Sequence, residues 1–273
     1  MEDTSKTGND GIALKCEGLT KLYTSGLIRT KTVVGARDVT FDIKRGEIVS
    51  LAGESGSGKS TVARMILRLI KPTSGDIALN GRSIYSYNIR EYYRQVQAVF
   101  QDPYSAFNPF YIVDHVLERA FGLREDNLNR DERSKIIRST LESIGLNPSE
   151  VLGRYPHELS GGQMQRLLIG RSLLIGSQLL IADEPTSMID ASTRAGVLNL
   201  LLSLKKEKGL SVLFITHDIG QAQYVSERVI VMKQGEVVEQ GPVDEVFTRP
   251  QHPYTKELLA AVPTLYERWK ECS

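Results

Sequence analysis

The sequence predicts an α/β fold in which helices cover a largely parallel sheet. Short apolar runs alternate with amphipathic stretches along most of the chain, the pattern of strands joined by crossover helices. Two of these runs have uninterrupted apolar centres, as strands covered on both faces must have. A third run ends in a glycine-rich turn that opens a helical pattern.

The expected strands of this sheet are Glu47–Ala52, Leu179–Ala182 and Ser211–Thr216. The helical patterns that follow them cover Thr61–Ile70, Thr193–Lys206 and Ile219–Tyr224. In the first of these helices Val62, Ile66 and Leu69 share one face, so the helix has an apolar side that can pack on the sheet.

The pattern changes between Pro103 and Leu159, where no good β run occurs and Arg130–Ile144 has the periodicity of an amphipathic helix. We therefore expect a helical insertion over about residues 103–160. Three β-rich stretches outside the main sheet are expected to form a small antiparallel sheet: Ile12–Glu17, Val39–Ile43 and Gly75–Leu79.

The composition is that of an ordinary globular protein, with 41% hydrophobic and 25% charged residues among 273. The 34 Lys and Arg residues nearly cancel the 33 Asp and Glu residues, and a net charge of +1 gives no electrostatic argument for nucleic-acid binding. The two cysteines, Cys16 and Cys272, stand at opposite ends of the chain. They match neither a zinc site nor a disulfide framework, which fits a reducing compartment.

Targeting and membrane-spanning patterns are not found. Residues Met1–Asp10 lack the basic-then-apolar layout of a secretory signal. The most apolar stretch, Leu167–Ala182, is broken by polar residues and falls short of the roughly 18 residues needed to span a bilayer. We expect a soluble or at most peripheral protein.

A phosphate-binding loop is predicted between the first expected strand and its helix. The run Gly53-Glu54-Ser55-Gly56-Ser57-Gly58-Lys59-Ser60, with Thr61 next, fits the pattern GxxxxGK[ST]. Glycines let the N–H groups of such a loop point at one phosphate, and the helix N-terminus adds partial positive charge. Lys59 is expected to reach the β and γ phosphates, and Ser60 to bind Mg²⁺. The alternative is a chance glycine turn, which the flanking strand and helix disfavour.

Two carboxylates follow the strand Leu179–Ala182. We expect Asp183 to hold Mg²⁺ and Glu184 to act as the general base that polarises the attacking water. Carboxyl ends of parallel strands share one edge of a sheet, which also places His217, directly after Ser211–Thr216, at this edge. Its expected role is to contact the γ-phosphate and align the water with Glu184. The alternatives are a solvated acidic pair and a structural histidine.

The segment Leu159-Ser160-Gly161-Gly162-Gln163, with Met164-Gln165-Arg166 behind it, resembles the signature of the ATP-binding cassette (ABC) ATPases. It lies before the strand that carries Asp183, as in that family. Ser160 and the N–H groups after it open a helix whose N-terminus favours an anion, so the segment can form a second phosphate cradle. In isolation the same residues would equally make a helix cap.

The resemblance implies a P-loop NTPase (RecA-like) core with an antiparallel β subdomain and a helical insertion subdomain, and an ATPase that uses ATP and Mg²⁺. It also implies a dimer, because in this family the signature of one subunit closes over the ATP held by the other. The residues of the cradle are then Ser160, Gly161, Gly162 and Gln163.

Three further positions match the family one by one. Tyr23 stands where an aromatic ring stacks on adenine, and Gln101 matches the glutamine that senses Mg²⁺ and the attacking water. The segment Ser187-Met188-Ile189-Asp190 occupies the D-loop and departs modestly from the usual Ser-Ala-Leu-Asp. The phosphate, metal and base positions of the family are intact.

A narrower resemblance is to ATPases of oligopeptide, dipeptide and nickel importers. It is carried by Arg249–Thr255, which contains His-Pro-Tyr, by Asp102–Pro109 and by Arg154–Glu158. The segment Thr24–Val34 is similar to a loop of the second of the two ATPases that such importers carry. The chain then divides into an ABC ATPase domain, 1–248, and a C-terminal tail, 249–273, in which Cys272 alone predicts no metal cluster.

The function expected from this resemblance is coupling of ATP hydrolysis to uptake of oligopeptides, with oligosaccharides and nickel left open as cargo. Its expected partners are a second, non-identical ABC ATPase, two membrane permeases and, indirectly, an extracytoplasmic substrate-binding protein, with no nucleic acid. The expected location is the cytoplasmic face of the cell membrane. The alternatives are an ABC ATPase acting on ribosomes or DNA and a P-loop kinase, for which Leu159–Gln163 has no use.

Overall fold

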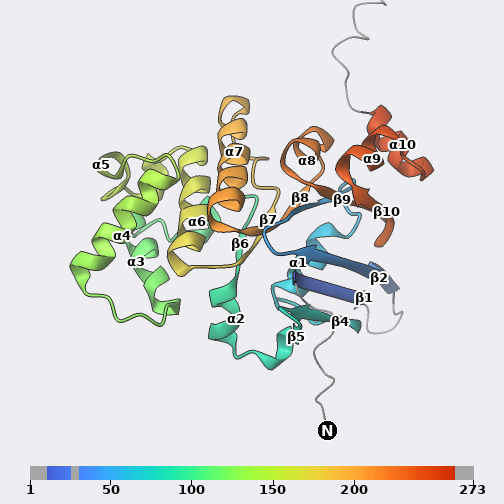
Figure 1. The fold of residues 1–273 in the computed structure, drawn as a ribbon, viewed down its shortest axis with the longest axis horizontal. Helices are drawn as coiled ribbons and strands as arrows, with labels where there is room; N and C mark the ends of the chain where they lie inside the picture. The colour runs from blue at the N-terminus through green and yellow to red at the C-terminus, as the bar shows by residue number, and fades with distance from the viewer. Residues whose placement is uncertain (1–10, 26–30, 262–273) are drawn as a thin grey trace, which may run out of the picture.

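The computed structural model describes residues 11–25 and 31–261 (Figure 1). Two sheets form its centre, a helical arm extends from one side, and two C-terminal helices cover the opposite end (Figure 1). The α/β fold with an antiparallel sheet and a helical insertion, predicted from the sequence, is confirmed.

The larger sheet has six strands in the order β10 (Glu236–Pro242), β9 (Arg228–Lys233), β3 (Ile48–Ala52), β8 (Ser211–Thr216), β7 (Leu179–Asp183) and β6 (Val96–Val99). All neighbouring pairs are parallel except β10 with β9. Every residue of β3 and β8 is buried, which explains their continuous apolar runs. The three strands predicted for this sheet are confirmed as β3, β7 and β8.

The predicted helices are present as α1 (Lys59–Ile66), α7 (Ala191–Lys208) and α8 (Ile219–Val225). The prediction of Thr61–Ile70 for the first was wrong at its C-terminal end. Arg68 adopts a left-handed conformation with φ of 57°, which stops the helix even though the apolar pattern continues to Leu69. Propensity and periodicity alone do not reveal such a stop.

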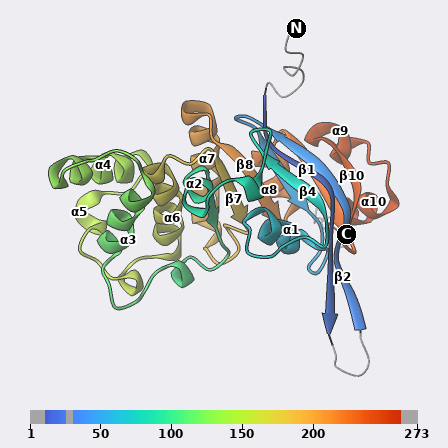
Figure 2. The same cartoon turned by 90° about the horizontal axis from the view of Figure 1, so that it is seen from below.

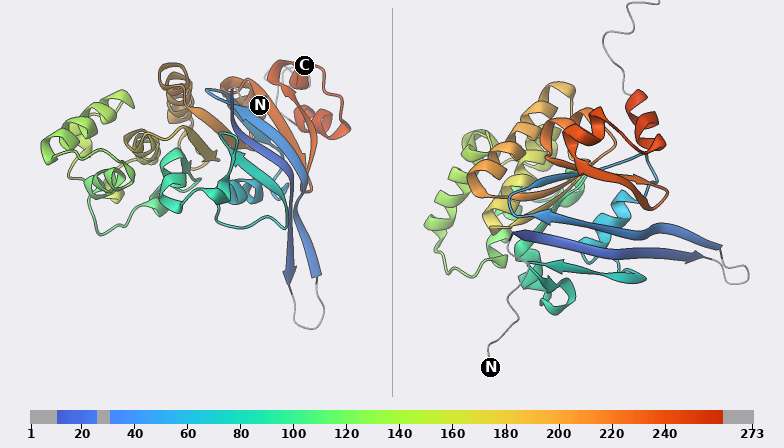
Figure 3. Two further views of the ribbon diagram at one scale, coloured as in Figure 1. Left: turned by 60° about the horizontal axis from the view of Figure 1, so that its bottom comes forward. Right: turned by 45° about the vertical axis from the view of Figure 1, so that its right-hand side comes forward.

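The smaller sheet is antiparallel, in the order β2 (Lys31–Lys44), β1 (Ile12–Ser25), β4 (Ser74–Leu79) and β5 (Arg82–Ser83). Its two long strands project from the body as a hairpin (Figure 3). The interpretation of Thr24–Val34 as a loop was wrong over most of its length, because Thr24 pairs with Thr32 and Ser25 with Lys31. The β-branched residues there favour strands. Residues 26–30 lie outside the described part of the chain.

The predicted insertion is helical, and no strand occurs between residues 103 and 160, all of which the structure describes. It forms the arm beside the larger sheet (Figure 2). Its α-helices are α3 (Val113–Ala120), α4 (Arg130–Ser143) and α5 (Pro148–Val151), and α6 (Gly161–Ile175) joins the arm to β7. A capping box between Asn129 and Glu132 starts α4, close to the predicted bounds. The remaining α-helix before β6 is α2 (Ile89–Gln95), and short 3₁₀ turns cover Ile84–Ser86, Tyr104–Ala106, Phe121–Leu123 and Pro156–Glu158.

The C-terminal helices α9 (Val243–Thr248) and α10 (Pro253–Ala260) pack on the outer strands of the larger sheet (Figure 1). Their buried side chains share an apolar cluster with Ala52 and Val231. Cys16 is fully buried and burial raises the pKa of its thiol, so this cysteine is chemically inert. Cys272 lies outside the described residues. Among the helices that the structure describes, none has both the length and the apolar character needed to cross a membrane.

Candidate functional site

The phosphate loop and the predicted catalytic and metal-binding residues lie at one edge of the larger sheet, where its parallel strands end. The strand register pairs Ala52 with Thr216 and Asp183 with Ile215. The phosphate loop after β3, His217 after β8 and the carboxylates at the end of β7 therefore leave the sheet side by side. Strand ends of this kind place polar groups at a crevice outside the sheet.

The phosphate loop requires glycine at the positions where it packs most closely. A Cβ atom on Gly58, which has φ of 106°, would lie 2.5 Å from the carbonyl oxygen of Gly35 in β2. A Cβ on Gly53 would lie 2.3 Å from the carbonyl oxygen of Met232 in β9. Both contacts are impossible for a larger residue without displacement of backbone, so strands on two sides shape the loop.

Lys59 lies folded into this loop and is 5% exposed. Its ammonium group donates hydrogen bonds to the carbonyl oxygens of Gly53 at 2.6 Å and Glu54 at 2.8 Å. Burial lowers the pKa of Lys59, and the carboxylates of Glu184, Asp183 and Glu54 oppose that shift. The loop thus holds one buried cation facing acidic groups, an arrangement that suits an anionic ligand with a divalent metal.

Asp183 and Ser60 offer oxygen atoms to a divalent cation. Burial raises the pKa of Asp183, while a hydrogen bond from the Ser60 side chain, followed by the charges of Lys59 and Arg64, lowers it. The Ser60 hydroxyl, at the start of α1, and the Asp183 carboxylate, at the end of β7, therefore lie near each other. Hard oxygen ligands are those that Mg²⁺ prefers, so the pair fits the metal expected from the sequence.

Glu184 and His217 form a second pair at this edge. Nδ1 of His217 lies 3.0 Å from Oε1 of Glu184, and the Glu184 N–H donates to the Ile215 carbonyl oxygen at 2.9 Å. Glu184 has φ of 48°, a left-handed conformation that is costly for a residue with a long side chain. The bonds hold that conformation and fix the carboxylate beside the phosphate loop.

A hollow lies next to the loop, and Val33 and Gly35 form part of its lining. Eight of the sequence-predicted site residues also line it: Tyr23, Ser55, Gly56, Gly58, Lys59, Ser60, Thr61 and Glu184. Tyr23 is 38% exposed, and the Lys21 ammonium lies 5.6 Å from the centroid of its ring. An exposed aromatic ring at the mouth of a phosphate site can stack on a nucleobase.

Gln101 is not among the residues that line this hollow. It follows β6, is exposed, and makes no hydrogen bond within the described chain. Val99 pairs with Ala182, and Gln101 and Glu184 each lie two residues after their member of this pair. Gln101 therefore lies at the same sheet edge as Glu184, outside the lining of the hollow.

The signature residues do not reach the hollow of their own chain. Ser160 caps α6: the Gln163 N–H donates to its hydroxyl at 3.3 Å, and the Ser160 N–H donates to the Gln163 side chain at 2.9 Å. A Cβ on Gly162 would lie 2.2 Å from the Thr193 side chain, so this glycine lets α6 pack against α7. Within its own chain the segment is therefore a helix cap, and its residues do not line the hollow at the phosphate loop.

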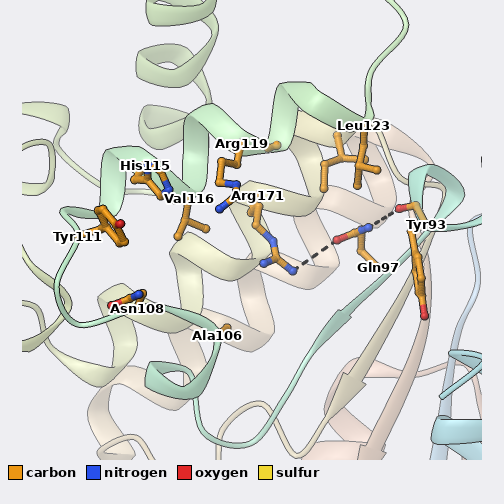
Figure 4. A pocket seen from close by; sticks show the side chains of 12 residues that line it. Tyr93, Gln97, Ala106, Asn108, Tyr111, His115, Val116, Arg119, Leu123 and Arg171 are labelled. Atoms are coloured by element: carbon orange, nitrogen blue, oxygen red, sulfur yellow. Dashed lines mark hydrogen bonds between the residues drawn. The ribbon is translucent and has the colours of Figure 1, made fainter. Parts of the chain in front are cut away.

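A groove separates β6 and its following loop from the helical arm (Figure 4). We call it the arm groove; its lining includes Tyr93, Gln97, Ala106, Asn108, Tyr111 and Arg171. Burial lowers the pKa of Arg171, and its Nε has no hydrogen-bond partner among the described residues. Its Nη2 lies 3.5 Å from the Gln97 side-chain oxygen (Figure 4). The groove thus combines aromatic walls with an incompletely paired cation.

Three residues that are distant from the phosphate loop along the chain contact it directly, and these contacts were not predicted from the sequence. Gly35 lies against Gly58, the Gly235 N–H donates to the Ser57 carbonyl oxygen at 2.8 Å, and the Tyr254 hydroxyl accepts from the Glu54 N–H at 3.1 Å. Tyr254 did stand out in the sequence, as part of the His-Pro-Tyr segment. The His-Pro-Tyr pattern does not by itself predict that Tyr254 contacts the phosphate loop.

Two family models match the chain. The model described as ABC transporter matches residues 36–187, which include the phosphate loop, the signature and the carboxylates. The model described as oligopeptide/dipeptide transporter, C-terminal region, matches residues 238–273.

Curated relatives are similar over most of the chain. The oligopeptide transport ATP-binding protein OppF of Bacillus subtilis is 44% identical over 85% of this chain and 77% of its own length. A putative peptide import ATP-binding protein of Brucella ovis is 41% identical over 92% of this chain and 78% of its own.

Solved structures share the fold. The cassette MJ0796, in a dimeric post-hydrolysis state bound to ADP and Pi, is 31% identical with a TM-score of 0.74, covering 84% of this chain and 98% of that one. The cbiO1 protein of Clostridium perfringens, part of the transporter complex cbiONQ, is 30% identical with a TM-score of 0.76, covering 88% of this chain and 92% of that one.

Proposed function

Because the chain belongs to the ABC transporter family of ATPases, we propose that it couples ATP hydrolysis to the uptake of peptides through separate membrane permeases. The observation that carries the chemistry is the hollow lined by Lys59, Ser60 and Glu184, with the Asp183 carboxylate next to Ser60. The C-terminal match and the names of the relatives support peptides as the cargo. The sequence alternatives of oligosaccharides and nickel have no such support.

The residues in and next to the hollow have separate roles in this proposal. Loop N–H groups and Lys59 would bind the β and γ phosphates, and Tyr23 would stack on the base. Mg²⁺ supplies charge neutralisation when it is bound by the oxygens of Ser60 and Asp183. Glu184 would accept the proton of the attacking water, with His217 orienting its carboxylate through their 3.0 Å contact.

A complete site requires a second cassette, we propose. Ser160 and the glycines after it start the fifteen-residue helix α6 but lie outside their own chain's hollow. The N-terminus of such a helix attracts an anion. The γ-phosphate held by a partner ATPase is the anion that fits, and the similar cassette MJ0796 is described as dimeric. Similarity to paired importer ATPases in the segment Thr24–Val34 supports a non-identical partner.

The arm groove is our proposed contact with the permease, at the cytoplasmic face of the membrane. It begins at Ala106 and Asn108, only a few residues after Gln101, and its far wall is the helical arm. A segment inserted there would touch both β6, next to the strand of Asp183, and the arm that carries Ser160. Movement of the arm relative to the sheet would then reach the membrane subunits directly.

The test of transport is uptake into vesicles that contain the permeases, the two ATPases and a substrate-binding protein. ATP-dependent uptake of labelled oligopeptides supports the proposal. Equal uptake with this chain as the only ATPase would refute the non-identical partner, and loss of the chain without any effect on uptake would refute the transport function.

We expect Ala106→Arg to prevent assembly with the permeases while ATP still binds. The new side chain fills the arm groove and adds a charge close to Arg171, whose Nε is already unpaired. Co-purification from membranes measures assembly, and Ser203→Arg, at an exposed position of α7, is the matched control. Normal co-purification of Ala106→Arg would exclude the groove as the contact.

Tyr23→Ala should weaken ATP binding by roughly 1–3 kcal/mol, the range measured for stacking of a base on an aromatic ring. GTP should bind wild type nearly as well as ATP, because stacking does not read the edges of the base. Titration calorimetry measures both ligands. Equal ATP affinity in wild type and variant would assign Tyr23 to packing alone.

A further inference from the structure

One peptide unit of the phosphate loop is held from both sides. The carbonyl oxygen of Gly53 accepts a hydrogen bond from the Lys59 ammonium at 2.6 Å, and the N–H of the same peptide unit, on Glu54, donates to the Tyr254 hydroxyl at 3.1 Å. In a trans peptide the C=O and N–H groups point in opposite directions. Tyr254 and Lys59 therefore hold the Gly53–Glu54 peptide between them.

Tyr254 is itself firmly placed. It is 3% exposed, and burial raises the pKa of its phenol, so the hydroxyl stays protonated at neutral pH. The Lys233 ammonium, at the end of β9, lies 4.4 Å from the centroid of its ring. The backbone N–H of Tyr254 donates to Nδ1 of His252 at 3.2 Å, and this bond caps the N-terminus of α10.

The segment before Tyr254 is tied to the sheet by one carboxylate. Glu239 in β10 accepts from the N–H groups of Gln251 at 2.8 Å and His252 at 3.1 Å. Despite partial burial, these bonds hold the pKa of Glu239 below its usual value, so the carboxylate remains ionised and the anchor persists. The chain from β10 to Tyr254 thus forms a brace between the sheet and the phosphate loop.

We propose that Tyr254 is a positioning residue of the ATP site, through which the C-terminal segment sets the orientation of the Gly53–Glu54 peptide and hence of Lys59. This inference rests on the proposed binding of ATP phosphates by Lys59. If the peptide rotates, the Gly53 carbonyl no longer meets the ammonium, and the loop must be reordered before phosphate can bind. When a smaller fraction of the free protein has the loop in its binding-competent conformation, the apparent affinity for ATP falls by that fraction.

The test is the Mg-ATP affinity of the full chain with Tyr254→Phe, which removes only the hydroxyl. A single hydrogen bond is worth a roughly two- to tenfold change in affinity. We expect the Kd for ATP, and the KM, to rise by that factor while kcat stays within about twofold, because Glu184 and His217 are untouched. Tyr87→Phe is the matched control: Tyr87 is 7% exposed and donates to the Leu79 carbonyl oxygen at 2.8 Å, outside the ATP site.

Unchanged ATP affinity in Tyr254→Phe, or an equal loss in Tyr87→Phe, would overturn the inference. Lys59→Ala separates this failure from failure of the site itself, since it should abolish tight binding whatever Tyr254 does. If Tyr254→Phe does not fold, hydrogen exchange of the backbone amides in the wild-type chain tests the same bond. The Glu54 amide should exchange with solvent more slowly than those of Ser55 and Gly56, which are exposed in the same loop; equal exchange would refute the bond.

Discussion

Glu184→Gln should bind Mg-ATP and hydrolyse it roughly a hundred- to ten-thousand-fold more slowly than wild type, the range for loss of a positioned general base. The amide oxygen of Gln can still accept the hydrogen bond from Nδ1 of His217, so the geometry of the pair is preserved. What disappears is the ability to take the proton of the attacking water. Single-turnover hydrolysis measures the chemical step, and Glu207→Gln, at an exposed position of α7, controls for the charge change.

The same variant should trap the closed dimer, because the γ-phosphate is not cleaved. Ser160→Arg should stop turnover by another route: its long side chain blocks the N-terminus of α6, so each chain binds ATP and no closed dimer forms. Gel filtration with Mg-ATP and the partner ATPase distinguishes a stable dimer from open chains. Identical behaviour of the two variants, or wild-type hydrolysis by Glu184→Gln, would contradict this division of roles.

Lys59→Ala should reduce ATP affinity by more than roughly a hundredfold, the scale for removing one partner of a buried charge interaction. Lys59 is 5% exposed, and its buried positive charge interacts with Glu184, Asp183 and Glu54. Without it, these carboxylates repel the phosphates. Burial lowers the pKa of Lys59, so binding should also weaken as rising pH removes its proton.

Fluorescent-nucleotide titration measures this loss directly. Lys208→Ala, which removes an exposed cation at the end of α7, is the control for a general change in charge. Retained affinity in Lys59→Ala would mean that the loop does not bind the phosphates, and the assignment of the site would have to be abandoned.

Local patterns in the sequence were sufficient for the core of the fold. The fully buried strands β3 and β8 require continuous apolar runs, and such runs are visible without any structure. The phosphate loop could be predicted because its glycines and Lys59 lie within eight consecutive residues. Parallel strands then bring Asp183, Glu184 and His217 to the same edge by a general rule of α/β sheets.

The tertiary structure decided whatever depends on partners distant in the chain. Pairing between β1 and β2 extended the hairpin into the segment Thr24–Val34, and the left-handed Arg68 ended α1 before its apolar pattern did. The contact of Glu54 with Tyr254 joins residues 200 positions apart. The sequence around either residue does not indicate the other. Their hydrogen bond forms only when β3 lies beside β9 and the C-terminal segment packs on the sheet next to the loop.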